Sequence, residues 1–142
     1  MSIESIDNIL REAAVSYETS SSMNLVELAR LGISKKSLQK LAEIGGLSIK
    51  QFTELLPVSL RTIQRYSGGD LLPREVSDHA LLIAEVFAKG AEVFDNRESF
   101  QRWLQSSLVG LGGQTPLSLL DTSFGIRMIM NELGRLEHGV YS

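Results

Sequence analysis

Short polar residues stand immediately before most of the helical patterns in this sequence, and this feature most constrains the fold. Ser, Thr and Asn side chains accept hydrogen bonds from the free N–H groups in a helix's first turn. The patterns that follow them repeat apolar residues three or four positions apart. Val, Ile and Thr never form the alternating runs that strands require. We therefore predict an all-α fold, with helices over residues 3–15, 24–31, 35–44, 48–56, 59–66, 74–93, 96–104 and 123–137.

Composition permits a packed core and limits the chemistry. The chain has 142 residues, 43% of them hydrophobic, and no cysteine, which excludes disulfides and thiolate zinc sites. A serine-rich stretch over residues 16–22 predicts a loop or linker, and we expect residues 1–22 to form a flexible N-terminal segment. Neither a secretory signal nor a run of about 18 apolar residues is visible. These features predict a cytoplasmic protein with no membrane contact, metal or cofactor.

The net charge of −3 conceals a basic middle. Residues 30–66 contain seven basic and two acidic side chains and therefore carry +5, which leaves −8 on the rest of the chain. A basic stretch concentrated in an acidic protein is typical of a nucleic-acid contact.

Within this basic stretch, two short capped helices joined by a three-residue turn predict a helix-turn-helix over residues 48–66. The turn is residues 57–59, counting the serine that caps the second helix. Arg can pair with guanine and Gln with adenine, while Ser or Thr at a helix start suits phosphate. Lys35 and Lys36 are also expected near phosphate, and binding is expected to need a dimer. A helical hairpin that binds no DNA is the alternative. The side chains predicted to contact DNA are Lys50, Ser59, Arg61, Thr62, Gln64 and Arg65.

The glycine-rich stretch "GLGGQTPLSLLDTSFG" predicts a structural loop before the last helix. Gly112 and Gly113 allow backbone angles that other residues avoid, and Pro116 favours the first turn of a short helix. Thr122 can cap the last helix, and Gly125 in its first turn implies a close backbone approach. No strand precedes the glycines and no Lys follows them, which argues against a phosphate-binding loop.

The last predicted helix is apolar on more than one face. Such a helix is either buried on all sides or pressed against a partner. We favour a partner surface, and a helix tucked into the core is the alternative. The apolar residues are Phe124, Ile126, Met128, Ile129, Met130, Leu133 and Leu136.

Several motifs stand at fixed spacing in the C-terminal half: Trp-Leu at 103–104, Leu-Gly-Gly at 111–113 followed by a proline, Leu-Leu-Asp-Thr at 119–122, a further glycine, and "LGRLEHG" at 133–139. With these motifs, residues 46–141 resemble the Xre/MbcA/ParS antitoxins of bacterial toxin–antitoxin operons. The N-terminal half resembles the family's Xre-like domain more loosely. We assign the motif residues to folding: Trp103, Gly112, Gly113, Pro116, Thr122 and Gly125.

The resemblance implies an Xre-like helix-turn-helix domain over residues 23–72 and a helical toxin-binding and dimerisation domain over residues 73–142. It implies a homodimer that blocks a RES-domain toxin, an enzyme that consumes NAD, and that binds operator DNA of its own operon. The C-terminal tail is implied to reach the toxin's active-site cleft. The residues implied to face the toxin are Arg127, Asn131, Arg135, Glu137, His138, Gly139, Val140 and Tyr141.

Two features depart from the family pattern. The segment "SSLVG" lacks the proline that relatives commonly carry before the glycines, and His79 replaces a usual arginine. We expect His79 to be a surface residue. A dimeric transcriptional regulator and a localisation adaptor, each without a toxin partner, are the alternative functions. An enzyme is not expected, because no catalytic constellation is visible.

Overall fold

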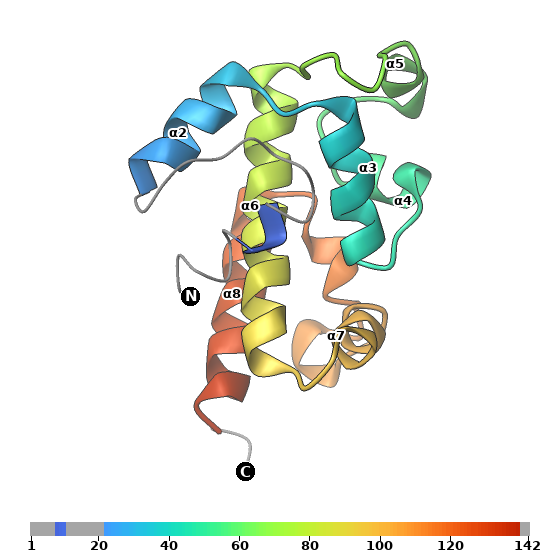
Figure 1. Ribbon diagram of the computed structural model, residues 1–142. Coiled ribbons are helices and arrows are strands. Elements are labelled where there is room, and N and C mark those ends of the chain that lie inside the picture. Colours follow the sequence, from blue (N-terminus) through green and yellow to red (C-terminus); the bar gives the residue numbers. More distant parts are fainter. Residues whose placement is uncertain (1–7, 11–21, 140–142) are drawn as a thin grey trace.

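The computed structural model describes residues 8–10 and 22–139 (Figure 1). Residues 8–10 are helical, and the rest of the predicted N-terminal helix lies outside the described residues. Within the described part, the sole extended pairing is an isolated bridge between Ser34 and Leu71, which confirms the all-α fold. The elements are α2 (Ser22–Leu31), α3 (Lys35–Ile44), α4 (Ile49–Thr53), α5 (Leu60–Gln64), α6 (Arg74–Val93), α7 (Arg97–Leu104), the 3-10 helices η1 (Val109–Leu111) and η2 (Leu117–Leu119), and α8 (Ser123–Glu137).

The long helix α6 is the centre of the molecule. It contacts α2 and α3 on the N-terminal side and α7 and α8 on the C-terminal side, and Figure 1 shows α8 running beside it. Phe87 of α6 stacks on Phe52 of α4, with 6.2 Å between ring centroids, and meets the edge of Phe100 of α7 at 6.1 Å. A single hydrophobic core therefore extends through both halves.

Side-chain caps begin the helices as predicted. Ser34, Ser48, Ser59, Asn96 and Thr122 each accept a hydrogen bond from the backbone N–H three residues further on. At Ser48 the cap is a complete capping box, because the Gln51 side chain also accepts from the Ser48 amide at 2.9 Å. The helices predicted over residues 35–44, 74–93 and 123–137 have those bounds in the structure. Local capping chemistry therefore accounts for most helix starts.

The two helices of the predicted helix-turn-helix are shorter than expected. They end at residues 53 and 64 instead of 56 and 66, so residues 54–59 join them and the predicted three-residue turn is wrong. The Leu56 amide donates to the Thr53 carbonyl at 3.0 Å, which tightens the chain beyond an α-helical turn. The physical reason is Pro57, because a proline disfavours helical angles at the residue before it.

The glycine-rich loop turns sharply between α7 and α8. Gly112 and Gly113 have φ angles of 68° and 81°, in the left-handed region that favours glycine. Their turn is closed by a hydrogen bond of 2.9 Å from the Gly113 amide to the Leu108 carbonyl. At the start of α8, a Cβ on Gly125 would lie 1.6 Å from the Leu119 carbonyl oxygen. The expected close backbone approach at Gly125 is therefore present.

Candidate functional site

The outer face of α5 carries the side chains predicted to read DNA. Arg61, Gln64 and Arg65 are exposed, whereas Ile63 on the inner face is only 1% exposed and belongs to the core. Lys50 on α4 is exposed as well. Guanidinium and carboxamide groups are suited to base edges and ammonium groups to phosphate. The structure therefore builds a polar face on two short helices anchored by buried apolar residues.

Two of the residues predicted to contact DNA also have a local structural role. The Ser59 hydroxyl accepts from the Thr62 amide at 3.1 Å and donates to the Thr62 hydroxyl oxygen at 2.9 Å. Thr62 is half-buried. These hydroxyls cap α5, the helix that presents the arginines.

Helix α8 has one buried and one exposed face. Ile126, Ile129 and Leu133 are buried in the core. On the opposite side Phe124 is 78% exposed, with the guanidinium of Arg127 lying 5.6 Å from its ring centroid. This arrangement agrees with the sequence expectation of a helix that is apolar beyond its core face.

The exposed residues of α8 form one continuous stripe, because they are spaced three or four positions apart. Exposed aromatic, Met and Arg side chains together are typical of protein–protein interfaces. Arg135 is also paired with Glu132 at 2.6 Å. We name this surface the α8 stripe; it consists of Phe124, Arg127, Met128, Asn131 and Arg135.

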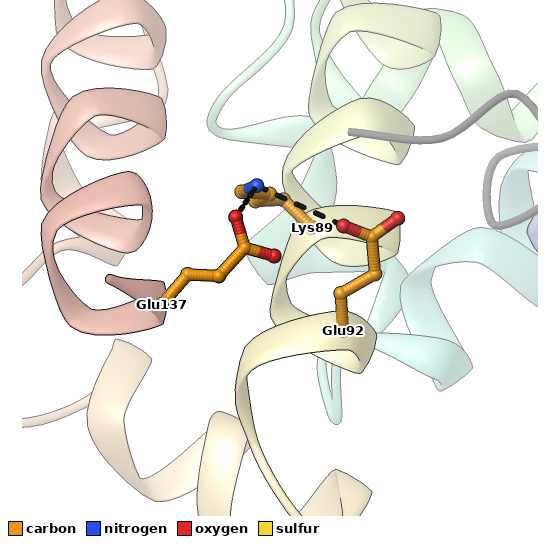
Figure 2. A network of polar contacts seen from close by, with 3 residues as sticks. All are labelled: Lys89, Glu92 and Glu137. Atoms are coloured by element: carbon orange, nitrogen blue, oxygen red, sulfur yellow. Dashed lines mark hydrogen bonds and ion pairs between the residues drawn. The ribbon is translucent and has the colours of Figure 1, made fainter. Parts of the chain in front are cut away.

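Glu137, predicted to face a toxin, is bound by the chain itself. Its Oε1 accepts from the Lys89 ammonium at 2.5 Å, and Glu92 lies 3.7 Å from the same nitrogen (Figure 2). The Lys89 side chain is 8% exposed. The hydrogen bond with Glu137 raises the pKa of Lys89, although burial opposes this shift. This pair ties the last turn of α8 to the C-terminal part of α6.

The tail residues predicted to face the toxin come directly after Glu137 in the chain. His138 and Gly139 are exposed, and Gly139 has a φ of 69°. Val140 and Tyr141 lie outside the described residues. The structure thus brings the α8 stripe and the beginning of the tail together on one element.

Sequence reasoning missed a shallow groove beside α8. Trp103, Leu108 and Leu111 line it from α7 and the glycine loop, and Glu132 and Leu136 line it from α8. Trp103 itself stacks on Phe100 at 6.3 Å and packs against Phe94 at 5.7 Å. No local pattern could have found the groove, because its walls come from segments brought together only by folding.

Comparison with known proteins gives two adjoining matches. Residues 25–85 match the Antitoxin Xre-like helix-turn-helix domain, and residues 89–139 match the Antitoxin Xre/MbcA/ParS C-terminal toxin-binding domain. The chain is 30% identical over 122 residues to Antitoxin Xre of Yersinia enterocolitica serotype O:8, covering 83% of this chain and 81% of that one. The chain belongs to the Xre/MbcA/ParS family of antitoxins.

This Xre-family antitoxin has other relatives. It is 25% identical over 130 residues to Antitoxin Xre of Photorhabdus laumondii subsp. laumondii, covering 90% of this chain and 88% of the relative. It also superposes, with a TM-score of 0.60 and 19% identity, on a chain of the crystal structure of the M. tuberculosis MbcT-MbcA toxin-antitoxin complex. That superposition covers 76% of this chain and 96% of the other, and it shows a shared fold.

The two matched regions of the antitoxin meet inside α6. The first part of that helix belongs to the helix-turn-helix match and its last residues, beginning with Lys89, to the C-terminal match. One continuous helix therefore carries both regions.

His79, which we expected at the surface, is only partly exposed and has a partner within the antitoxin. The residue is half-buried, and its Nε2–H donates to the Leu120 carbonyl at 2.7 Å. Leu120 closes the glycine loop just before α8 begins. The physical reason is that α6 and α8 run side by side, which places the start of α6 against the entrance of α8.

Other kinds of site find no support in the described residues of the antitoxin. Its described His, Asp and Glu residues form no cluster able to hold a metal ion. None of its described helices has the length and apolar character needed to cross a bilayer.

Proposed function

We propose that this antitoxin binds a RES-domain toxin, an NAD-consuming enzyme, through α8 and the tail that follows it. The observation that carries the proposal is the α8 stripe, an exposed row of aromatic, Met and Arg side chains within the region that matches the family's toxin-binding domain. Binding there blocks the toxin's substrate cleft sterically, so the antitoxin itself performs no chemistry.

In this proposal the stripe and the tail have different roles. Arg127, Asn131 and Arg135 provide charged and amide groups for the toxin surface, next to an apolar patch. Residues 138–141 reach toward the cleft. Glu137 is held by Lys89 and fixes where the tail begins. Residues 73–142 form the toxin-binding and dimerisation domain, and the protein acts in the cytoplasm as a homodimer.

A truncation tests this proposal, and its end point matters. Removing Glu137 would leave the Lys89 ammonium buried beside Glu92 alone, which costs stability. The informative variant therefore ends at Glu137 and lacks residues 138–142. The RES-domain protein of the same operon is co-expressed with the tagged antitoxin, and both co-purification and NAD consumption are measured.

The full chain should retain the toxin and suppress NAD consumption. The truncated chain should melt within a few degrees of the full chain, because among the described contacts it loses the hydrogen bonds from the His138 and Gly139 amides at the end of α8. It should nevertheless release the toxin or leave it active. A truncated chain that inhibits as well as the full chain would remove the tail from the mechanism. If the full chain retains no toxin, the proposed partner is wrong and a DNA-binding regulator remains.

We also propose that residues 23–72 bind the promoter of the operon, with α5 in the major groove. The exposed Arg61, Gln64 and Arg65 support this proposal, as does the match to a helix-turn-helix domain. Replacing either arginine with alanine should cost about 1–3 kcal/mol of operator affinity if it reads a base. With about two to four phosphate contacts per protomer of a dimer, log affinity should fall with log salt at a slope of about −4 to −7. Binding that does not respond to salt would contradict the assignment.

A further inference from the structure

The orientation of α5 depends on contacts from outside the helix. α5 spans only Leu60–Gln64, and so short a helix is not stable by itself in water. Ser59 caps its start and Ile63 anchors its inner face. What holds its carbonyl end determines how the arginines on its outer face are aimed.

The carbonyl end of α5 is held by Lys35, the first residue of α3. The Lys35 ammonium donates to the carbonyl oxygen of Tyr66 at 2.8 Å, across 31 positions of sequence, and the Lys35 side chain is partly buried. Backbone carbonyls near a helix C-terminus lack partners within the helix, and a cation there is favourable. Lys35 therefore supplies the charged partner that this end of α5 lacks.

The loop after α5 is bound to the same place. The amides of Lys35 and Lys36 donate to the carbonyls of Asp70 and Gly68 at 3.1 and 2.9 Å. The Asp70 carboxylate in turn accepts from the Ser67 amide at 2.8 Å. The first N–H groups of α3, which have no partner within the helix itself, thus anchor the segment that leaves α5.

The neighbouring Lys36 differs in its side chain. It is exposed, and among the described residues its ammonium makes no hydrogen bond or ion pair. Two adjacent lysines, both expected from the sequence to contact phosphate, therefore occupy different environments. One is committed to a carbonyl of the chain itself, and the other is available to a ligand.

We propose that Lys35 is a positioning residue that orients α5 through the Tyr66 carbonyl, and that Lys36 is the lysine of the pair that contacts the DNA backbone. The proposal rests on the proposed binding of operator DNA. In this proposal Lys35 supports sequence recognition by orienting α5, and Lys36 supplies electrostatic attraction to the DNA backbone.

Matched substitutions in the full-length protein separate these roles. Lys35→Met and Lys36→Met keep the aliphatic stem and remove the charge, while Lys35→Arg keeps a donor for the Tyr66 carbonyl. A fluorescently labelled duplex of the operon's promoter and a scrambled duplex of the same composition are titrated with each variant by anisotropy at several potassium chloride concentrations.

Lys35→Met should weaken promoter binding about tenfold, because the variant has no charged donor for the Tyr66 carbonyl. The salt slope and the affinity for scrambled DNA should stay unchanged. Lys35→Arg should restore most of the affinity. Lys36→Met should weaken both duplexes equally and reduce the slope by about one unit for each phosphate that the lysine no longer neutralises. A slope that falls in Lys35→Met as it does in Lys36→Met would overturn the inference.

Hydrogen exchange keeps the test independent of DNA. Amides of residues 60–66 should exchange faster in Lys35→Met than in the wild type. In Lys36→Met their exchange rates should equal those of the wild type. Equal exchange in all three proteins would refute the positioning role even if DNA binding changed. If the wild type does not distinguish promoter from scrambled DNA, the proposed DNA-binding function fails, while the exchange result still decides the role of Lys35.

Discussion

At the scale of single residues, two glycines of α8 have opposite surroundings. A Cβ at Gly125 would lie 1.6 Å from the backbone oxygen of Leu119, while a Cβ at Gly134 would meet nothing within 4 Å. Helix propensity favours alanine over glycine at both positions. Replacing glycine with alanine should therefore change stability through packing at Gly125 and through backbone entropy at Gly134.

We predict that Gly125→Ala lowers the free energy of unfolding by about 3 kcal/mol, because a backbone carbonyl has to move. Gly134→Ala, the matched control, should raise it by about 0.5–1 kcal/mol. Urea unfolding followed by circular dichroism measures both. Equal effects at the two positions would show that the close approach at Gly125 does not control stability.

The Lys89–Glu137 pair makes part of the stability depend on pH. Its hydrogen bond raises the pKa of Lys89 in the folded protein. The stabilisation is therefore complete below the unfolded pKa of about 10.4, and it is lost as the pH rises through the higher folded value.

We predict that Glu137→Gln has a lower melting temperature than the wild type at about pH 8. The difference should shrink as the pH rises above the ordinary lysine pKa of about 10.4 and Lys89 loses its proton. Glu132→Gln is the control, because its partner Arg135 keeps its charge throughout this range. Differential scanning calorimetry across the range measures both. A Glu137→Gln difference that stays constant with pH would contradict the role of the Lys89 charge.

At the scale of elements, α8 has a core face and an exposed face, and our proposal assigns folding to the first and toxin recognition to the second. Ile129 on the inner face is 0% exposed, whereas Phe124 and Met128 on the outer face are 78% and 48% exposed. Substitutions on the inner face should act through stability. Those on the outer face should act through the partner.

We predict that Phe124→Ala combined with Met128→Ala changes the free energy of unfolding by no more than about 0.5 kcal/mol. The same double variant should weaken toxin binding about tenfold or more, as loss of interface anchors does. Ile129→Ala should cost about 2–5 kcal/mol of stability. Calorimetric titration with the toxin and urea unfolding give the two quantities, and unchanged toxin affinity in the double variant would place the interface elsewhere.

At the scale of the whole molecule, the two proposed binding regions lie at opposite ends of one body. Figure 1 shows α5 at one end and the C-terminal end of α8 at the other, with α6 between them. The two halves also meet where the Gln101 carboxamide of α7 donates to the Ile44 carbonyl at the end of α3, at 3.0 Å. The core is shared by both halves, so we expect them to unfold together.

We predict that Leu38→Ala, in α3, lowers the urea midpoint detected at Trp103 as much as the midpoint detected by circular dichroism. Leu38 is 0% exposed, so the cavity should cost about 2–5 kcal/mol. Trp103 is the single tryptophan of the chain and lies in the C-terminal half. Leu31→Ala, at a position 69% exposed, is the control. If Leu38→Ala leaves the urea midpoint detected at Trp103 unchanged, the two halves unfold independently.

The features that the sequence predicted correctly depend on neighbours within one turn of helix. Thr122 caps α8 through the amide three residues ahead, and Ser34 does the same for α3. Such hydrogen bonds form wherever the backbone is helical, so propensity and capping alone predicted most of the element order. The ends of α4 and α5 were predicted too late in the sequence. For α4 the reason is Pro57, which disfavours helical angles at the residue before it although the apolar pattern continues.

By itself, the sequence determined an all-α fold, its helix starts, the membership of a family and the exposure of arginines on α5. Only the tertiary structure decided that Lys35 holds the end of α5, that Glu137 is bound by Lys89 and that His79 binds the Leu120 carbonyl. Each of these contacts joins residues more than thirty positions apart. The identity of a charged or polar residue sets what it can bind, but the packing of α3, α6 and α8 sets which partner lies within reach.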